Sequence, residues 1–241
     1  MKKTLSLACL LALFAGAAHA APYYLPQPAG GALTPYDMQP VYSLEGLYNW
    51  TARHGLPDTA GGRLRFNLYN NAESTVRHQF SIAAGYEAGR RSASPADLGS
   101  LYHGLLAEPL GEYLPGVPEV ESASIRLELE KLPITLGYDL NIALTDHLLL
   151  DFGARGGYAF GFVRGHVRDL VAAERSLPGY KEHLTTGGCT FALTAGLKIQ
   201  FSESIYGHLA YEFGRTYYTK HLPHSLNFSQ HGVVLGFGVL F

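Results

Sequence analysis

Apolar side chains alternate with small or polar ones along eight separate stretches of this 241-residue chain. Successive side chains of a β-strand point to opposite faces, so each stretch predicts a strand with one apolar and one polar face. In one of them, Phe191 and Leu193 share a face, whereas Thr194 and Lys198 share the other. The eight stretches are residues 42–51, 63–69, 76–88, 132–144, 148–163, 188–201, 204–218 and 232–241.

The connections between these stretches alternate in length. Residues 70–75, 145–147 and 202–203 are short polar turns, whereas residues 54–62, 89–124, 164–187 and 219–230 are longer loops. Short turns at one end and long loops at the other are typical of an up-and-down barrel in an outer membrane. The sequence therefore predicts an all-β fold, an eight-stranded antiparallel up-and-down transmembrane β-barrel.

The chemistry of the two faces decides which of them lies inside. One face carries bulky Leu, Ile, Phe and Tyr, whereas the other carries mainly Gly, Ser, Thr, Asn and charged residues. Eight strands enclose a narrow interior that small and hydrogen-bonding side chains can fill, whereas a water-soluble barrel turns its apolar face inward. We therefore expect the apolar face to contact lipid, with an aromatic girdle at each interface. The girdle residues are Tyr42, Phe201 and Phe241 at the short-turn end, and Trp50, Tyr86, Phe162 and Tyr217 at the other.

The first 20 residues predict a cleaved signal peptide. Lys2 and Lys3 precede an apolar run that is too short to span a bilayer, and residues 18–20 form an A-x-A cleavage site. Residues 21–40 contain several prolines and predict an extended periplasmic segment, which leaves residues 41–241 for the barrel.

Composition and charge exclude other classes of protein. Of 18 Lys and Arg residues, Lys2 and Lys3 leave with the signal, so 16 remain against 20 acidic residues and the net charge is −4. This balance disfavours nucleic-acid binding. No run of 18 or more apolar residues follows the signal, which excludes a transmembrane helix there. The remaining cysteine, Cys189, can form neither an internal disulfide nor a Cys-based metal site.

Two segments resemble known outer-membrane proteins. Residues 232–241, with alternating apolar residues and a terminal Phe, resemble the C-terminal signature of bacterial outer-membrane β-barrels. Residues 132–162 resemble the paired strands and short turn of the small OmpA-like or opacity-type barrels. The resemblance implies that Phe237, Val239 and Phe241 are recognised by the outer-membrane assembly machinery. It also implies periplasmic termini and short turns. The chain departs from the larger OmpA proteins because no periplasmic peptidoglycan-binding domain is expected after the barrel.

Charged residues on the predicted inward face are balanced in sign. The acids are Glu45, Glu87, Asp139, Asp151 and Glu212, and the bases are Arg63, Arg65, Arg77, Arg155 and Lys198. Unpaired charge in a narrow barrel costs several kcal/mol per ion, so this set predicts an ion-pair network that plugs the lumen. The alternative, a selective ion path, usually needs rings of charge biased to one sign.

The alternation changes phase near Lys131. Apolar residues occupy the odd positions in 125–130 and the even positions beyond Lys131. A β-bulge at residues 130–132 would explain the change, and so would departure of the strand from the membrane.

The long loop at residues 89–124 predicts an amphipathic helix over residues 95–107. Ser94, Pro95 and Asp97 suit its N-cap, first and third positions, and the helix should end before Pro109. Apolar residues at helical spacing are Leu98, Leu101, Tyr102, Leu105 and Leu106. This stripe either packs against the barrel rim or forms a binding surface for an unknown extracellular partner.

No catalytic, metal or cofactor site is expected. The exported chain lacks the His-x-Ser pair of a deacylase-type Ser–His hydrolase, and Ser229 and His231 occur in the reverse order. A proline separates His221 from His224 and no acid lies nearby, which makes a metal site there weak. His208 faces the lumen, where a structural hydrogen bond is expected.

Two function classes fit these features. The first is an outer-membrane protein with a structural or surface-interaction role, in contact with outer-membrane lipids and with the outside through its long loops. The alternative is a small transport barrel for ions or small apolar solutes.

Overall fold

A computed structural model describes residues 41–51, 56–70, 76–98, 101–111, 120–145, 147–172, 175–201, 205–220 and 226–240. The predicted signal peptide, the proline-rich segment and Phe241 lie outside these residues. Within the described part of the chain, no helix is both long and apolar enough to cross a membrane.

The described chain consists almost entirely of strands. These are β1 (Val41–Thr51), β2 (Thr59–Asn70), β3 (Val76–Ala93), β4 (Val120–Ala143), β5 (Leu148–Ala172), β6 (Arg175–Leu177), β7 (Tyr180–Gln200), β8 (Ile205–Lys220) and β9 (Leu226–Leu240). The described residues between β3 and β4 include the short helical elements η2 (Pro95–Asp97), η4 (His103–Ala107) and α2 (Glu108–Gly111).

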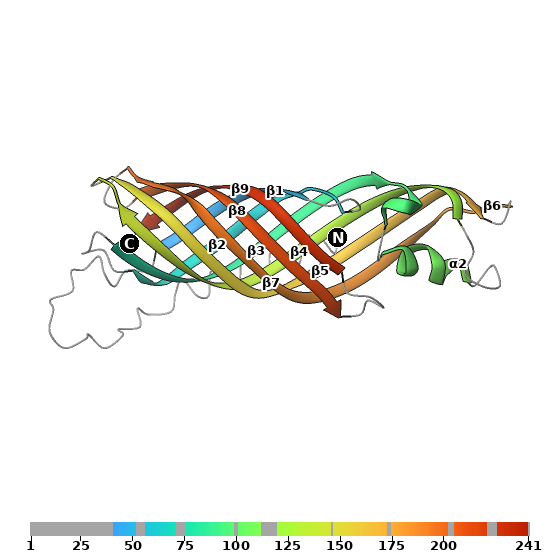
Figure 1. Cartoon of the computed structure of the whole chain (residues 1–241), viewed down its shortest axis with the longest axis horizontal. Helices are drawn as coiled ribbons and strands as arrows, with labels where there is room; N and C mark the ends of the chain where they lie inside the picture. The colour runs from blue at the N-terminus through green and yellow to red at the C-terminus, as the bar shows by residue number, and fades with distance from the viewer. Residues whose placement is uncertain are drawn as a thin grey trace.

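Eight of the strands close into a ring (Figure 1). Each of β1, β2, β3, β4, β5, β7, β8 and β9 pairs with the next, and β9 pairs with β1, always antiparallel. The short strand β6 pairs only with the end of β5. Paired residues can be followed round the ring from Asn67 of β2, which lies next to the partner of Tyr42, to Thr51 at the far end of β1. This stagger tilts the strands relative to the barrel axis. The predicted eight-stranded antiparallel up-and-down barrel is confirmed.

Outward side chains form an apolar band around most of the barrel. Leu136 and Phe237 are 63% and 67% exposed, and the same face of β8 carries Leu209 and Tyr211. Inward positions on the same strands are buried and polar, as Asp139 on β4 shows. The barrel is therefore apolar outside and polar inside, the arrangement of a wall that faces lipid.

The wall reverses its polarity at the end of the barrel that carries α2, on the right in Figure 1. There β3, β4, β5 and β7 continue beyond the apolar band, through residues 89–93, 120–130, 162–172 and 180–187, and we call this part the extension. On β4 the inward side chains of Leu127 and Leu129 are buried. The outward Glu130 instead accepts two hydrogen bonds from Arg164 of β5, at 2.7 and 3.1 Å. Apolar inside and charged outside is the pattern of a protein surrounded by water.

The phase change at Lys131 therefore has a simple cause. The pairing of β4 with β5 runs without a register shift from Ser124 to Ala143, so no bulge lies at residues 130–132. The same face points inward throughout, and only its chemistry changes. Of the two explanations, departure of β4 from the apolar band is the one that the structure supports. The loop predicted at residues 164–187 is consequently strand over most of its length, and the loop predicted at residues 89–124 is strand at its two ends.

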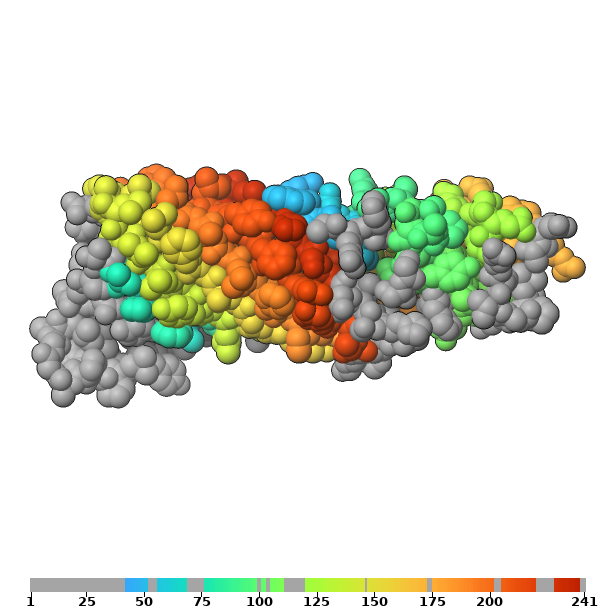
Figure 2. Space-filling view, in the orientation of Figure 1, coloured from blue at the N-terminus to red at the C-terminus, as the bar shows by residue number. Residues whose placement is uncertain are grey.

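The helical turns between β3 and β4 pack on the inner face of the extension. This segment, residues 95–111, is called the cap segment. Its green ribbon lies at the α2 end in Figure 1, and green spheres occupy the same end in the space-filling view of Figure 2. Ser94 begins it as predicted, since its backbone N–H and hydroxyl both donate to Asp97, at 2.9 and 2.7 Å. The single helix over residues 95–107 is wrong, because η2 ends at Asp97, Leu98 is not helical, and the later helical stretch formed by η4 and α2 continues past Pro109 to Gly111. Because α2 directly follows η4, Pro109 lies within a helical stretch, where it cannot donate to the carbonyl oxygen of Leu105 four residues earlier. That oxygen instead accepts a hydrogen bond from the Tyr180 hydroxyl at 2.7 Å.

Candidate functional site

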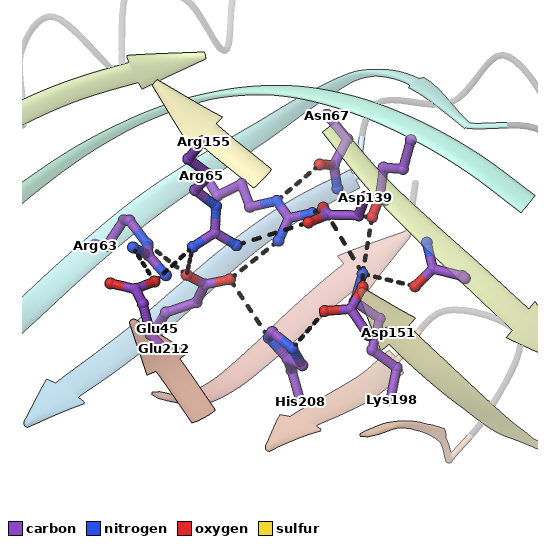
Figure 3. A network of polar contacts seen from close by, with 12 residues as sticks. Glu45, Arg63, Arg65, Asn67, Asp139, Asp151, Arg155, Lys198, His208 and Glu212 are labelled. Atoms are coloured by element: carbon purple, nitrogen blue, oxygen red, sulfur yellow. Dashed lines mark hydrogen bonds and ion pairs between the residues drawn. The ribbon is translucent and has the colours of Figure 1, made fainter. Parts of the chain in front are cut away.

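The middle of the lumen is filled by charged side chains that reach across the barrel (Figure 3). Glu212 of β8 accepts hydrogen bonds from Arg63 of β2 at 2.9 Å and from Arg155 of β5 at 3.0 Å. Arg63 also donates to Glu45 of β1 at 2.6 Å, and Arg65 lies 3.3 Å from the other oxygen of Glu45. Four strands, β1, β2, β5 and β8, are thereby tied to one another through the interior.

A second group of charges continues this network toward the short-turn end. Asp139 of β4 pairs with Arg65, and Lys198 of β7 pairs with Asp151 of β5 at 2.6 Å. The imidazole Nε2 of His208 lies 3.0 Å from Asp151 Oδ2. All these side chains are almost fully buried. His208 thus makes the expected structural hydrogen bond, with a carboxylate of β5.

A third group lies on the α2 side of the network. Glu87 of β3 pairs with Lys131 of β4 at 2.9 Å and accepts further hydrogen bonds from Asn49 and Thr59. Lys131 also donates to Gln230 of β9 at 2.8 Å. This group is a compact buried ion pair with its remaining hydrogen-bonding positions occupied by neutral side chains.

The structure brings together nine of the ten predicted lumen residues, and Arg77 is the exception. Arg77 lies half-buried near the start of β3, and no described carboxylate is within ion-pair distance of it. Lys131 takes its place in the charge balance, which leaves five acids and five bases in the lumen. Sequence reasoning missed Lys131 because it lies at the phase change, where its side chain could not be assigned to a face.

The cap segment closes the lumen on the α2 side with apolar packing. Leu101, Leu105 and Leu106 are buried among inward residues of β4 and β5, and Leu105 is fully inaccessible. Phe228 of β9 belongs to the same cluster, and β9 lies opposite β4 in the ring, so the cluster spans the barrel mouth. A Cβ on Gly165 would come within 2.8 Å of Leu105, so the leucine fits there only because that residue is glycine.

The predicted apolar surface on this loop is not exposed in the structure. Leu98, Leu101, Leu105 and Leu106 are buried, and only Tyr102 is partly exposed. The physical reason is the reversed polarity of the extension, whose inward leucines and valines require an apolar cover. The stripe provides that cover, and Tyr180 of β7 secures it by donating a hydrogen bond to the carbonyl oxygen of Leu105 at 2.7 Å. The exposed side of the extension is instead its charged outer wall.

The predicted assembly residues lie on the last strand. Phe237 is among the most exposed side chains of the lipid-facing band. The backbone of Val239 pairs with Tyr42 of β1 and with Ile205 of β8. Phe241 lies outside the described residues. The C-terminal strand therefore closes the ring, whereas its recognition during assembly stays a prediction.

The described side chains offer little for catalysis. Ser229 and His231 both point outward, and His231 Nδ1 is hydrogen-bonded to the hydroxyl of Tyr211. His208 and Asp151 are sealed in the lumen between other charges. No group of three or more metal-ligating His, Cys, Asp or Glu residues occurs within the described ranges.

No protein-family model and no curated protein sequence matches the chain. Several solved outer-membrane barrels are similar in fold. Ail, the attachment invasion locus protein of Yersinia pestis, is 12% identical, with 84% of this chain and 97% of Ail covered and a TM-score of 0.40. The N-terminal β-barrel domain of Pseudomonas aeruginosa OprF is 13% identical, with 83% and 97% covered and a TM-score of 0.38. The outer membrane protease OmpT of Escherichia coli is 8% identical, with 88% and 99% covered and a TM-score of 0.40.

Proposed function

We propose that the chain is an integral outer-membrane barrel, closed to solutes, with a structural or surface-interaction role. The observation that carries this proposal is the change in the outer wall, from an apolar band to a charged surface at the extension. Such a wall matches a barrel that spans a bilayer and projects into water on one side. Its partners are outer-membrane lipids, the assembly machinery through Phe237, Val239 and Phe241, and an extracellular partner that contacts the extension.

The contents of the lumen favour this role over transport. The ion pairs cross the lumen between strands that do not pair with each other, and the apolar cluster under the cap segment closes the α2 side. A conducting path would require both layers to open, and the buried charges would then lose partners at a cost of several kcal/mol each. No catalytic step is assigned: Ser229 and His231 lie on the outer wall, and His208 and Asp151 lie in the sealed lumen.

Location and orientation can be tested with cysteine labelling in intact cells. In a Cys189→Ser background, Lys181→Cys on the extension should react with a membrane-impermeant maleimide, whereas Thr145→Cys at a short turn should not. Both positions are exposed in the structure, so a difference in labelling reports the side of the membrane. Labelling of Thr145→Cys alone would invert the orientation, and recovery of the protein without detergent in the soluble periplasm would refute the membrane location.

Closure can be tested by planar-bilayer conductance of the refolded full-length protein. We expect no large, sustained single-channel current. Such a current from the wild-type protein would refute the closed barrel and favour the transport alternative.

A further inference from the structure

One arginine on the outer wall differs from the arginines of the lumen. Arg215 of β8 lies on the same face as Phe213 and Tyr217, between side chains that point away from the barrel. Among the described outward positions within the apolar band, it is the one Lys or Arg. An arginine facing lipid costs about 2–4 kcal/mol at the bilayer midplane and about 0–1 kcal/mol near the interface, so its depth matters.

The neighbours of Arg215 place it at the interface on the α2 side. Its guanidinium carbon lies 4.8 Å from the centre of the Tyr217 ring, and that ring stacks with Phe191 of β7 at 6.3 Å. Trp50 of β1 stacks on His231, the diagonal neighbour of Arg215 on β9. These are residues of the aromatic girdle, which belongs at the level of lipid headgroups.

Arg215 has no anionic partner among the described residues. Its Nε is buried without a hydrogen-bond partner, while the side chain as a whole remains partly exposed on the outer wall. The outward acids of the extension are already engaged, since Glu130 binds Arg164 and Glu128 lies 3.8 Å from both Arg126 and Arg164. A guanidinium in this position has donors available for an anion that approaches from the membrane.

We propose that Arg215, supported by the ring of Tyr217, binds the phosphate of an outer-leaflet lipid. A guanidinium presents paired N–H donors in one plane, which match phosphate oxygens in a bidentate contact. The aromatic ring beneath it holds the side chain at headgroup level and adds a cation–π contact. The adjacent apolar surface of Phe191 and Phe213 would lie against the acyl chains of the same lipid. This inference rests on the proposed outer-membrane location.

The test uses the full-length protein refolded in phosphatidylcholine nanodiscs, titrated with lipid A and followed by native mass spectrometry. Arg215→Gln should raise the apparent dissociation constant for lipid A by about tenfold, since one charge-assisted contact is lost. The apparent dissociation constant of Arg215→Lys should lie between those of wild type and Arg215→Gln, because an ammonium supplies charge without the planar pair of donors. With chemically dephosphorylated lipid A, wild type and Arg215→Gln should bind equally.

Arg90→Gln provides the matched control, because Arg90 is also an exposed outward arginine but lies on β3, on another side of the barrel. Its lipid A binding should equal that of wild type. An equal loss of lipid A affinity in both variants would show non-specific attraction. Unchanged affinity in Arg215→Gln would show that the side chain merely reaches water. Either result overturns the inference. A heat-dependent gel shift reports insertion separately. Failure of the wild-type protein to insert refutes the outer-membrane proposal and this inference together. Insertion without a difference in lipid A affinity between wild type and Arg215→Gln refutes this inference alone.

Discussion

Removing Lys131 should destabilise the barrel by leaving Glu87 buried without its cation. The two side chains are 6% and 4% exposed, and their charged atoms are 2.9 Å apart. Breaking a buried pair by removing one partner costs about 3–5 kcal/mol. Glu87 would keep its hydrogen bonds from Asn49 and Thr59. We therefore expect Lys131→Met to lower the free energy of unfolding by about 3 kcal/mol, the lower end of that range.

The double variant separates the lost charge pair from lost packing. In Glu87→Gln/Lys131→Met no buried charge remains, and stability should return to within about 1 kcal/mol of wild type. Urea unfolding in phospholipid vesicles measures these differences, and Trp50, the single tryptophan of the chain, supplies the fluorescence signal. Lys181→Met, a change at an exposed position of the extension, is the control and should have little effect. A cost below about 1 kcal/mol for Lys131→Met, or a double variant no more stable than the single one, would refute this reasoning.

Three further predictions concern single contacts. Arg155→Ala should cost less than Lys131→Met in the same urea titration, because Glu212 keeps Arg63 at 2.9 Å. Leu105 is fully buried, so Leu105→Ala should destabilise the cap segment by about 2–5 kcal/mol. It should also increase proteolysis within residues 95–111, read by mass spectrometry, without lowering barrel yield. Burial, together with the nearby Glu182 and Tyr102, raises the pKa of the Tyr180 hydroxyl to about 12. This folded-state pKa lies above the ordinary value of about 10. The stabilisation from the hydroxyl should therefore be complete below pH 10 and disappear as the pH rises from 10 to 12. Absorbance titration of the wild type against Tyr180→Phe can check this.

The alternation of side chains was enough to predict the barrel, because its chemistry is uniform within the apolar band. Leu136 and Asp139 differ by an odd number of positions and therefore must face opposite sides. The same logic placed Glu45, Arg63 and Glu212 inward. It could not name their partners, because Arg63 and Glu212 meet across the lumen from strands that do not pair with each other.

The sequence was misleading where the wall reverses polarity. A strand in water and a strand in lipid have opposite patterns, so the phase change at Lys131 was compatible both with a bulge and with departure of the strand from the membrane. The apolar stripe containing Leu101 and Leu105 was ambiguous for a related reason. Helical spacing identifies an apolar face, but only the buried valines and leucines of the extension show what covers it.

The abrupt change in the outer wall also fixes how deeply the protein can sit in a membrane. On β4 the outward residues change from Ile134 and Leu132 to Glu130 within two positions. Sliding inward would bring the Glu130–Arg164 pair into hydrocarbon, whereas sliding outward would bring Ile134 into water, and both displacements cost free energy. A bilayer that is too thick or too thin should therefore deform around the barrel, because the barrel itself has no low-cost way to shift along the membrane normal.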